Sequence, residues 1–256
     1  MLEQEVDTSL LNQIYIPADA GHVFIDQETE FRQMMMMYSC AIKEIKTKLQ
    51  VLNDELSIKR QRNPIEFIKT RVKQPDSIAS KLRRKGYPVT VQSVFENLSD
   101  VAGVRVICAF IDDIYKVADM LSAQDDVVLI KTKDYIKKPK MNGYRSLHLI
   151  VEVPIFLEDE KRAMKVEVQF RTIAMDFWAS LEHKIRYKFE GKAPQHINEE
   201  LKACSDIVNM LDAKMLSLNE EVQALPKVGI EEQHEENVRM QKMWEENKIV
   251  DKLQKK

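Results

Sequence analysis

Glycine is scarce and scattered in this chain, and this excludes two familiar ways of building a nucleotide-binding fold. The 256 residues include 6 glycines, and no two of them lie within ten residues of each other. A dinucleotide-binding fingerprint or a P-loop needs clustered glycines, because backbone N–H groups must closely approach the phosphates. If the chain binds a nucleotide, side chains must therefore hold the phosphates.

Positive charge is concentrated in two short segments, although the formal net charge of the chain is −2. Residues 69–85 hold seven basic residues and one acid, and residues 131–145 hold six basic residues and one acid. The rest of the chain therefore carries a net charge of −13. Such focused charge predicts recognition of a small polyanion and disfavours a general nucleic-acid binder, so DNA is not an expected partner.

Hydropathy and cysteine usage bear on the cellular compartment. No apolar run approaches the roughly 18 residues that a membrane span requires, and the N-terminal residues Glu3, Glu5 and Asp7 are unlike a signal peptide. The 3 cysteines are widely spaced and lie in apolar contexts, as is typical of reduced thiols. We therefore expect a cytoplasmic protein with no membrane partner.

A heptad-like stripe of apolar residues predicts one long amphipathic helix near the N-terminus. Its members follow one another in steps of four and three, which keeps them on one side of a helix. They are Phe31, Met35, Tyr38, Ile42, Ile45, Leu49, Leu52 and Leu56. The stripe either packs in the core or forms a seam with another helix.

The rest of the pattern predicts an α+β fold, a mixed four-to-five-stranded sheet flanked by helices, with helical N- and C-terminal extensions. A helix is expected from about Asp76, capped by Asp76 or Ser77 and ended at Gly86. Strands are expected at about 104–110, 126–131, 146–153 and 164–171, and further helices near 111–122, 172–189 and 198–225, and from about 230. We expect three parts: an arm at 1–25, a domain at 26–225 and an amphipathic helix at 226–256.

Two carboxylates are candidate magnesium ligands. In the strand at 164–171 polar and apolar residues alternate, which places Glu167 and Gln169 about 7 Å apart on one face. Asp100 comes just before the first of these strands. Because Mg²⁺ takes a few carboxylate ligands and shares the rest with phosphates, Asp100 and Glu167 together suit it. Taken singly, Asp100 could cap a turn and Glu167 could be a solvated sheet residue.

The basic segments offer ligands for phosphates and for a base. The candidate phosphate ligands Arg71, Lys73, Lys81 and Arg84 lie within 14 residues of one another. They form either a solvated face or an anion site. In the second segment Tyr144 is placed to stack on a base, or it belongs to a tight turn. His148, taken alone, is a sheet histidine.

Five motifs, taken together, resemble the small alarmone synthetases, which are single-domain GTP pyrophosphokinases. The motifs are RVKQPDSIASKLRRK, SDVAGVRVICAF, KDYI, NGYRSLH and VEVQFRTIAMDFWASLEHKIRYK. The resemblance covers about residues 30–215. It implies a nucleotidyltransferase-like synthetase fold and transfer of the β,γ-pyrophosphate of ATP to the 3′-hydroxyl of GDP or GTP, giving AMP and (p)ppGpp.

The resemblance also implies roles for individual residues. Asp100 is similar to the family's magnesium ligand, and Glu167 to a second ligand and the base near the 3′-hydroxyl. Residues implied to bind ATP are Arg71 and Arg105, which sandwich the adenine, and Lys73, Ser77, Lys81 and Arg84, which contact the phosphates. Residues implied to bind GDP or GTP are Lys133, Lys140, Asn142, Tyr144, His148 and Gln169, with Tyr144 stacking on guanine.

The resemblance is weaker at the positions that the family uses for regulation. One branch is activated by its own product in the central cleft of a tetramer, lined by basic residues of the first long helix. Lys46 fits this pattern, but Gln50 and Asn53 replace expected basic residues and disfavour such activation. A homo-oligomer, most simply a tetramer, is expected. No His-Asp dipeptide occurs, so synthesis without hydrolysis is expected.

Two functions other than catalysis are alternatives for this chain. A non-catalytic regulator would use the same basic cleft to sense nucleotides or single-stranded RNA, but it would gain nothing from carboxylates beside phosphates. A structural protein built on the helical stripes would leave both basic segments unexplained. The sequence does not distinguish GDP from GTP as the preferred acceptor.

Overall fold

The computed structural model describes residues 28–60, 62–187, 189 and 194–225. The predicted arm at 1–25 and the predicted helix at 226–256 lie outside these residues. One compact unit ends at Asp212 and a second begins at Ala213. All of the site described below belongs to the first unit. Within the described ranges, no helix combines the length and apolar character needed to cross a membrane.

Five strands form one mixed sheet in the order β1–β2–β5–β4–β3. Strands β2 and β5 run parallel, and all other neighbours run antiparallel. The strands are β1 (Ile65–Val72), β2 (Ala102–Cys108), β3 (Val128–Asp134), β4 (Leu147–Phe156) and β5 (Lys161–Thr172). The predicted mixed sheet and its four predicted strands are confirmed. The fifth strand is β1, for which the sequence pattern showed only a short apolar stretch.

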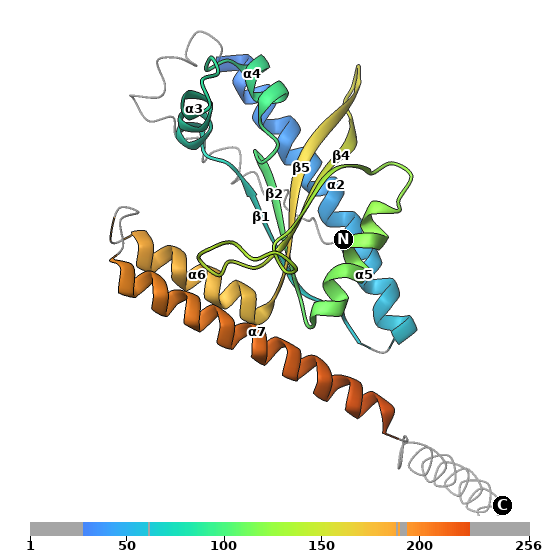
Figure 1. Ribbon diagram of the computed structural model, residues 1–256. Coiled ribbons are helices and arrows are strands. Elements are labelled where there is room, and N and C mark those ends of the chain that lie inside the picture. Colours follow the sequence, from blue (N-terminus) through green and yellow to red (C-terminus); the bar gives the residue numbers. More distant parts are fainter. Residues whose placement is uncertain (1–27, 61, 188, 190–193, 226–256) are drawn as a thin grey trace, which may run out of the picture. The chain divides into compact units, whose positions relative to one another are not determined.

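One face of the sheet is covered by α2 (Glu28–Arg60), with α5 (Ile111–Ser122) beside it (Figure 1). All eight residues of the predicted apolar stripe are buried, with at most 8% of the surface of any of them exposed. The same face of β5 contributes Met164, Val166, Val168 and Phe170, which are also buried. The stripe therefore packs in the core of this chain, so it is not free to form a seam with another subunit.

Two short helices connect β1 to β2. The first, α3 (Pro75–Arg84), begins before the predicted cap, because Pro75 takes the first turn and Gln74 stands at the N-cap with no side-chain hydrogen bond. The predicted caps Asp76 and Ser77 were therefore wrong. The predicted end was right, since Gly86 has a φ of 77° just beyond the helix.

The second connecting helix, α4 (Val91–Asn97), has no counterpart in the prediction. Its N-cap is Thr90, whose side chain accepts a hydrogen bond from the backbone N–H of Ser93 at 3.1 Å. A helix of 7 residues is too short to show apolar periodicity, so only the cap could have indicated it.

The helices α6 (Ile173–Tyr187) and α7 (Gln195–Ala224) follow the last strand, as predicted. The hydroxyl of Thr172, at the end of β5, accepts from the backbone N–H of Met175 and donates to Asp212 at 2.8 Å. The indole N–H of Trp178 on α6 donates to the carbonyl of Leu201 on α7, also at 2.8 Å. These bonds fix the first part of α7 against the end of β5.

Candidate active site

The face of the sheet opposite α2 carries a row of polar side chains that crosses all five strands. Residues directly opposite each other on neighbouring strands project from the same face. Strand register gives this row one residue from each strand, in the order Lys69, Arg105, Gln169, His148 and Lys133. The adjacent row contains Arg71, Gly103 and Glu167. Residues predicted to bind ATP and residues predicted to bind GDP or GTP thus lie on the same face of the sheet.

A small cavity opens on the β1–β2–β5 side of this face. It measures about 210 Å³, and its lining includes Arg71, Asp100, Gly103, Arg105, Glu167 and Gln169. Gly103 lies between Arg71 and Glu167 in the sheet, so the missing side chain leaves space between them. The structure therefore brings together the two predicted carboxylates and both predicted adenine-binding arginines.

Asp100 is held by two cations. The ammonium groups of Lys73 and Lys81 both bond to its Oδ2, Lys73 at 2.6 Å. Burial disfavours the ionised carboxylate, but these two lysines outweigh it, and the pKa of Asp100 lies below its ordinary value. Asp100 Oδ1 is buried and lacks a hydrogen-bond partner among the described residues. A buried acceptor without a donor suits a cation, so the Asp100–Glu167 pair fits the expected Mg²⁺.

The other two predicted phosphate ligands lie further out on α3. Ser77 and Arg84 are exposed and do not line the cavity, whereas Lys81 reaches Asp100. The three residues are spaced by four and three positions, so they occupy one side of the helix. The helix thus presents this side toward the cavity mouth, with Lys81 innermost.

Glu167 is positioned by two neighbours. Gln169 donates from Nε2 to Glu167 Oε2 at 2.8 Å, and His148 Nδ1 lies 3.4 Å from Glu167 Oε1. Burial opposes ionisation, but the hydrogen bonds from His148 and Gln169 outweigh it and keep the pKa of Glu167 below its ordinary value. Burial also lowers the pKa of His148. The His148 imidazole is therefore neutral at neutral pH and donates from Nδ1 to the Glu167 carboxylate, which favours the ionised form of Glu167.

Aromatic rings gather next to Glu167. The ring of Tyr144 makes edge contacts with Tyr135 and His148, and Lys140 Nζ lies 4.6 Å from its centroid. The Tyr144 hydroxyl is 2.8 Å from His148 Nε2 and accepts from Arg171 at 2.8 Å. Four of the residues predicted to bind GDP or GTP therefore meet here: Lys140, Tyr144, His148 and Gln169. Lys133 sits in the same row, opposite His148.

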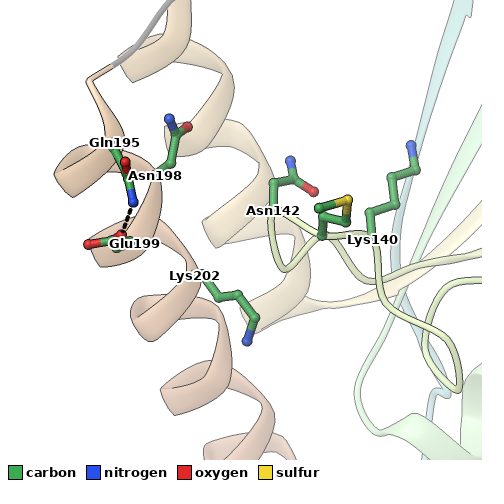
Figure 2. Close-up of a pocket in the computed structure, with 7 residues that line it drawn as sticks. Lys140, Asn142, Gln195, Asn198, Glu199 and Lys202 are labelled. Carbon is green, nitrogen blue, oxygen red and sulfur yellow. Dashed lines mark hydrogen bonds between the residues drawn. The ribbon is translucent and has the colours of Figure 1, made fainter.

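The loop that carries Tyr144 is attached to both C-terminal helices. Asn142 donates from its amide to Glu182 on α6 at 3.0 Å and accepts from the backbone N–H of Tyr144. Gly143 has a φ of 89°, and its carbonyl accepts from Ser205 on α7 at 2.5 Å. The loop and α7 line a cavity of about 570 Å³, whose residues include Lys140, Asn142, Asn198 and Lys202. The side chain of Lys140 points away from α7 (Figure 2).

Several residues of this surface were not predicted. Gly103 and Tyr135 lie inside the quoted motifs, but nothing about them alone signals a role. Arg171 follows Gln169 in the alternation of the strand predicted at 164–171, but nothing in the sequence assigned it a role. Asp176, in the first turn of α6, bonds to Arg171 at 2.9 Å and to Arg105 at 3.0 Å. Sequence spacing could not indicate these contacts, because they depend on how β2 and α6 are placed.

Carboxylates beside cations, next to a cluster of aromatic rings, suit the binding of phosphorylated nucleotides with a divalent cation. Comparison with known proteins agrees with this class of site. Residues 70–192 match the family model described as a region found in RelA / SpoT proteins. GTP pyrophosphokinase YwaC of Bacillus subtilis is 46% identical over 193 residues, which span 75% of this chain and 92% of that protein.

Solved structures give the same result. The crystal structure of small alarmone synthetase 2 from Bacillus subtilis has a TM-score of 0.69 and 45% identity, covering 75% of this chain and 99% of that one. Small alarmone synthetase 1 from Bacillus subtilis, bound to its product pppGpp, has a TM-score of 0.70 and 36% identity, covering 76% and 98%. The chain belongs to the small alarmone synthetases of the RelA/SpoT type.

Proposed function

We propose that this chain transfers the β,γ-pyrophosphate of ATP to the 3′-hydroxyl of GDP or GTP. The observation that carries the proposal is the shared face on which Asp100, Glu167, Arg71 and Arg105 line one cavity directly beside Tyr144. In the reaction the 3′-oxygen bonds to the β-phosphorus, the bond from that phosphorus to the α,β-bridging oxygen breaks, and AMP leaves. The proton of the 3′-hydroxyl passes to Glu167.

On the donor side, Arg71 and Arg105 hold the adenine between two guanidinium groups. Lys73 and Lys81 neutralise the phosphates, and Ser77 and Arg84 extend this surface along α3. In the free protein Lys73 and Lys81 are paired with Asp100. When ATP binds, these lysines therefore exchange the Asp100 carboxylate for the phosphates of ATP. Asp100 and Glu167 would hold Mg²⁺, which supplies further neutralisation of the transferring group.

On the acceptor side, Tyr144 stacks on guanine, with Lys133, Lys140, Asn142, His148 and Gln169 around the nucleotide. The hydrogen bonds to Glu167 from Gln169 and His148 fix the carboxylate and keep it ionised at neutral pH. An ionised carboxylate is the form that accepts the proton of the attacking hydroxyl. The same contacts therefore place the base and set its protonation state.

Substitution of Glu167 by glutamine tests this function against a non-catalytic binder of nucleotides or RNA. The purified chain is incubated with labelled ATP, Mg²⁺ and GDP or GTP, and AMP and pyrophosphorylated guanosine are measured. We expect product from the wild type and at least about 100-fold less from Glu167→Gln, with unchanged melting temperature. Glu152→Gln, on the same sheet face outside the cavity, is the matched control. Absence of product from the wild type would support the binder instead.

We also propose that the chain forms a homo-oligomer, most simply a tetramer, through its C-terminal helices. On α6, Ile173, Phe177, Leu181 and Ile185 recur every fourth residue and are exposed. Such a row of apolar side chains is typical of an interface. Phe177→Glu should lower the mass measured by light scattering, whereas Ile58→Glu, at an isolated exposed position on α2, should not. A wild-type monomer would contradict the proposal.

Product activation is not part of the proposed function. The cavity between α2 and β1 is lined by Lys46, Gln50, Asn53, Asp54 and Glu66, among others. Asn53 uses its side-chain oxygen to accept from the backbone N–H of Ile65, and the two acids outnumber Lys46. This surface offers little to a polyanion. We further propose that the catalytic domain spans 26–225 and acts in the cytoplasm, hydrolysing no alarmone.

A further inference from the structure

Arg171 and Asp176 form an ion pair that is almost completely buried behind the active face. Their guanidinium and carboxylate meet at 2.9 Å, and their exposed fractions are 5% and 6%. Removing two charges from water is costly, and such a pair persists only where good geometry compensates. Arg171 is the last residue but one of β5, and Asp176 lies in the first turn of the helix that follows the strand.

Asp176 also contacts residues on the side of the site that is proposed to bind ATP. The same Oδ1 that bonds Arg171 accepts from Arg105 at 3.0 Å, and Oδ2 lies 3.6 Å from Lys69 Nζ. Arg105 lines the cavity proposed for ATP. One buried carboxylate thus fixes the arginine that is proposed to contact the adenine.

Arg171 also contacts Tyr144, on the side of the site that is proposed to bind GDP or GTP. Its NH2 group, the one that Asp176 does not hold, donates to the Tyr144 hydroxyl at 2.8 Å. Its guanidinium carbon also lies 5.1 Å from the centroid of the Tyr144 ring. A single arginine therefore sets the position of the ring that is proposed to stack on guanine.

We propose that Arg171 and Asp176 are positioning residues that hold Arg105 for the donor and Tyr144 for the acceptor at the same time. The inference rests on the proposed function for the identity of the two nucleotides. Arg171 uses both ends of its planar fork, which lysine cannot reproduce because it carries one ammonium group. Asp176 acts on both sides, directly on Arg105 and through Arg171 on Tyr144.

The two residues should therefore differ in their kinetic effects. In Arg171→Lys the ammonium can retain the Asp176 pair but not the bond to Tyr144, so KM for GDP should rise about 10- to 100-fold and KM for ATP should stay within twofold. In Asp176→Asn both KM values should rise. A purely structural role would reduce the amount of folded enzyme, which lowers kcat and leaves both KM values unchanged.

A double-mutant cycle with Tyr144→Phe makes the test independent of folding damage. Tyr144→Phe keeps the ring and removes the hydroxyl that Arg171 holds, so adding Arg171→Lys should raise KM for GDP no further. Fully additive effects on KM for GDP would overturn the proposal. So would an acceptor KM within twofold of wild type in Arg171→Lys, or unchanged KM values in Asp176→Asn.

Direct binding separates failure of this inference from failure of the proposed function. Calorimetric titration of the full chain with ATP and with GDP gives Kd values for the same variants. If the wild type makes no alarmone, the proposed function fails, while the expected pattern of Kd values still supports the positioning role. Kd values that do not change in either variant would overturn it.

Discussion

Gly143→Ala should impair the acceptor site while sparing the donor site. Gly143 has a φ of 89°, a conformation that L side chains rarely adopt, and its carbonyl bonds to Ser205. A methyl group added there would lie 2.6 Å from Ser205 Cβ and 2.8 Å from its Oγ. The loop must therefore move away from α7, and Tyr144 is the next residue along it.

Gly86 provides the matched control for the size of this effect. Its φ is 77°, yet a Cβ added there meets nothing within 4 Å. Alanine at either position costs about 1–2 kcal/mol in backbone strain. At Gly143 alone, the forced contact adds about 1–3 kcal/mol. That difference corresponds to a shift of roughly 5- to 150-fold in the population of the correct loop conformation.

Steady-state kinetics with each nucleotide varied in turn measures the shift. KM for GDP should rise by roughly 5- to 150-fold in Gly143→Ala relative to Gly86→Ala, with KM for ATP equal in the two variants. Adding Ser205→Gly to Gly143→Ala removes the obstructing atoms and should restore part of the acceptor affinity. Equal values of KM for GDP in the two alanine variants would refute the reasoning.

Three further predictions concern the core, the pH dependence of stability and regulation. Leu49 is fully buried on α2, so Leu49→Ala should lower the free energy of unfolding by about 2–5 kcal/mol in urea titration, whereas Val51→Ala, on the exposed side, should change it little. Because the pKa of Asp100 is lower in the folded state, its ion pairs stabilise the fold above about pH 4, its unfolded pKa, and the contribution is lost as pH falls through the folded pKa. The gap in unfolding free energy between wild type and Asp100→Asn should therefore narrow below about pH 4, and a gap that widens there would contradict the ion pairs with Lys73 and Lys81. Added pppGpp should leave the initial rate of synthesis unchanged, and an acceleration would contradict the conclusion drawn from the Lys46 surface.

Elements with strong periodicity were predictable from the sequence, whereas the edge strand β1 and the short helix α4 were missed. The long apolar stripe specified α2, and regular alternation specified β5, because both elements bury one face in the core. Strand β1 was missed because charged residues interrupt its apolar ones along a mostly exposed strand, so its pattern resembles a charged segment. The other edge strand, β3, was predictable because it begins with an uninterrupted apolar run. The start of α3 was misplaced because Asp76 suits the first turn as well as a cap.

Contacts of the site could be predicted from the sequence where both residues lie in one strand or one motif. The alternation in β5 placed Glu167 and Gln169 together, and the structure joins them by a hydrogen bond. Asp176 could not be inferred, because its contact with Arg105 spans 71 positions and requires a parallel pair of strands. The resemblance supplied the roles of Tyr144 and Asp100, for which composition and spacing left alternatives open.

The row of residues across the sheet makes activity a sensitive measure of correct strand pairing. Each of the five strands contributes one polar side chain to that row, and a slip of one residue in any strand would turn its contribution to the opposite face. The adjacent partners Arg105 and Gln169 are 64 residues apart in the chain, so the central pairing forms only after a long loop closes. No fragment that lacks β5 can assemble the two carboxylates. Catalysis by the proposed site therefore requires the strands that carry its residues to pair in register.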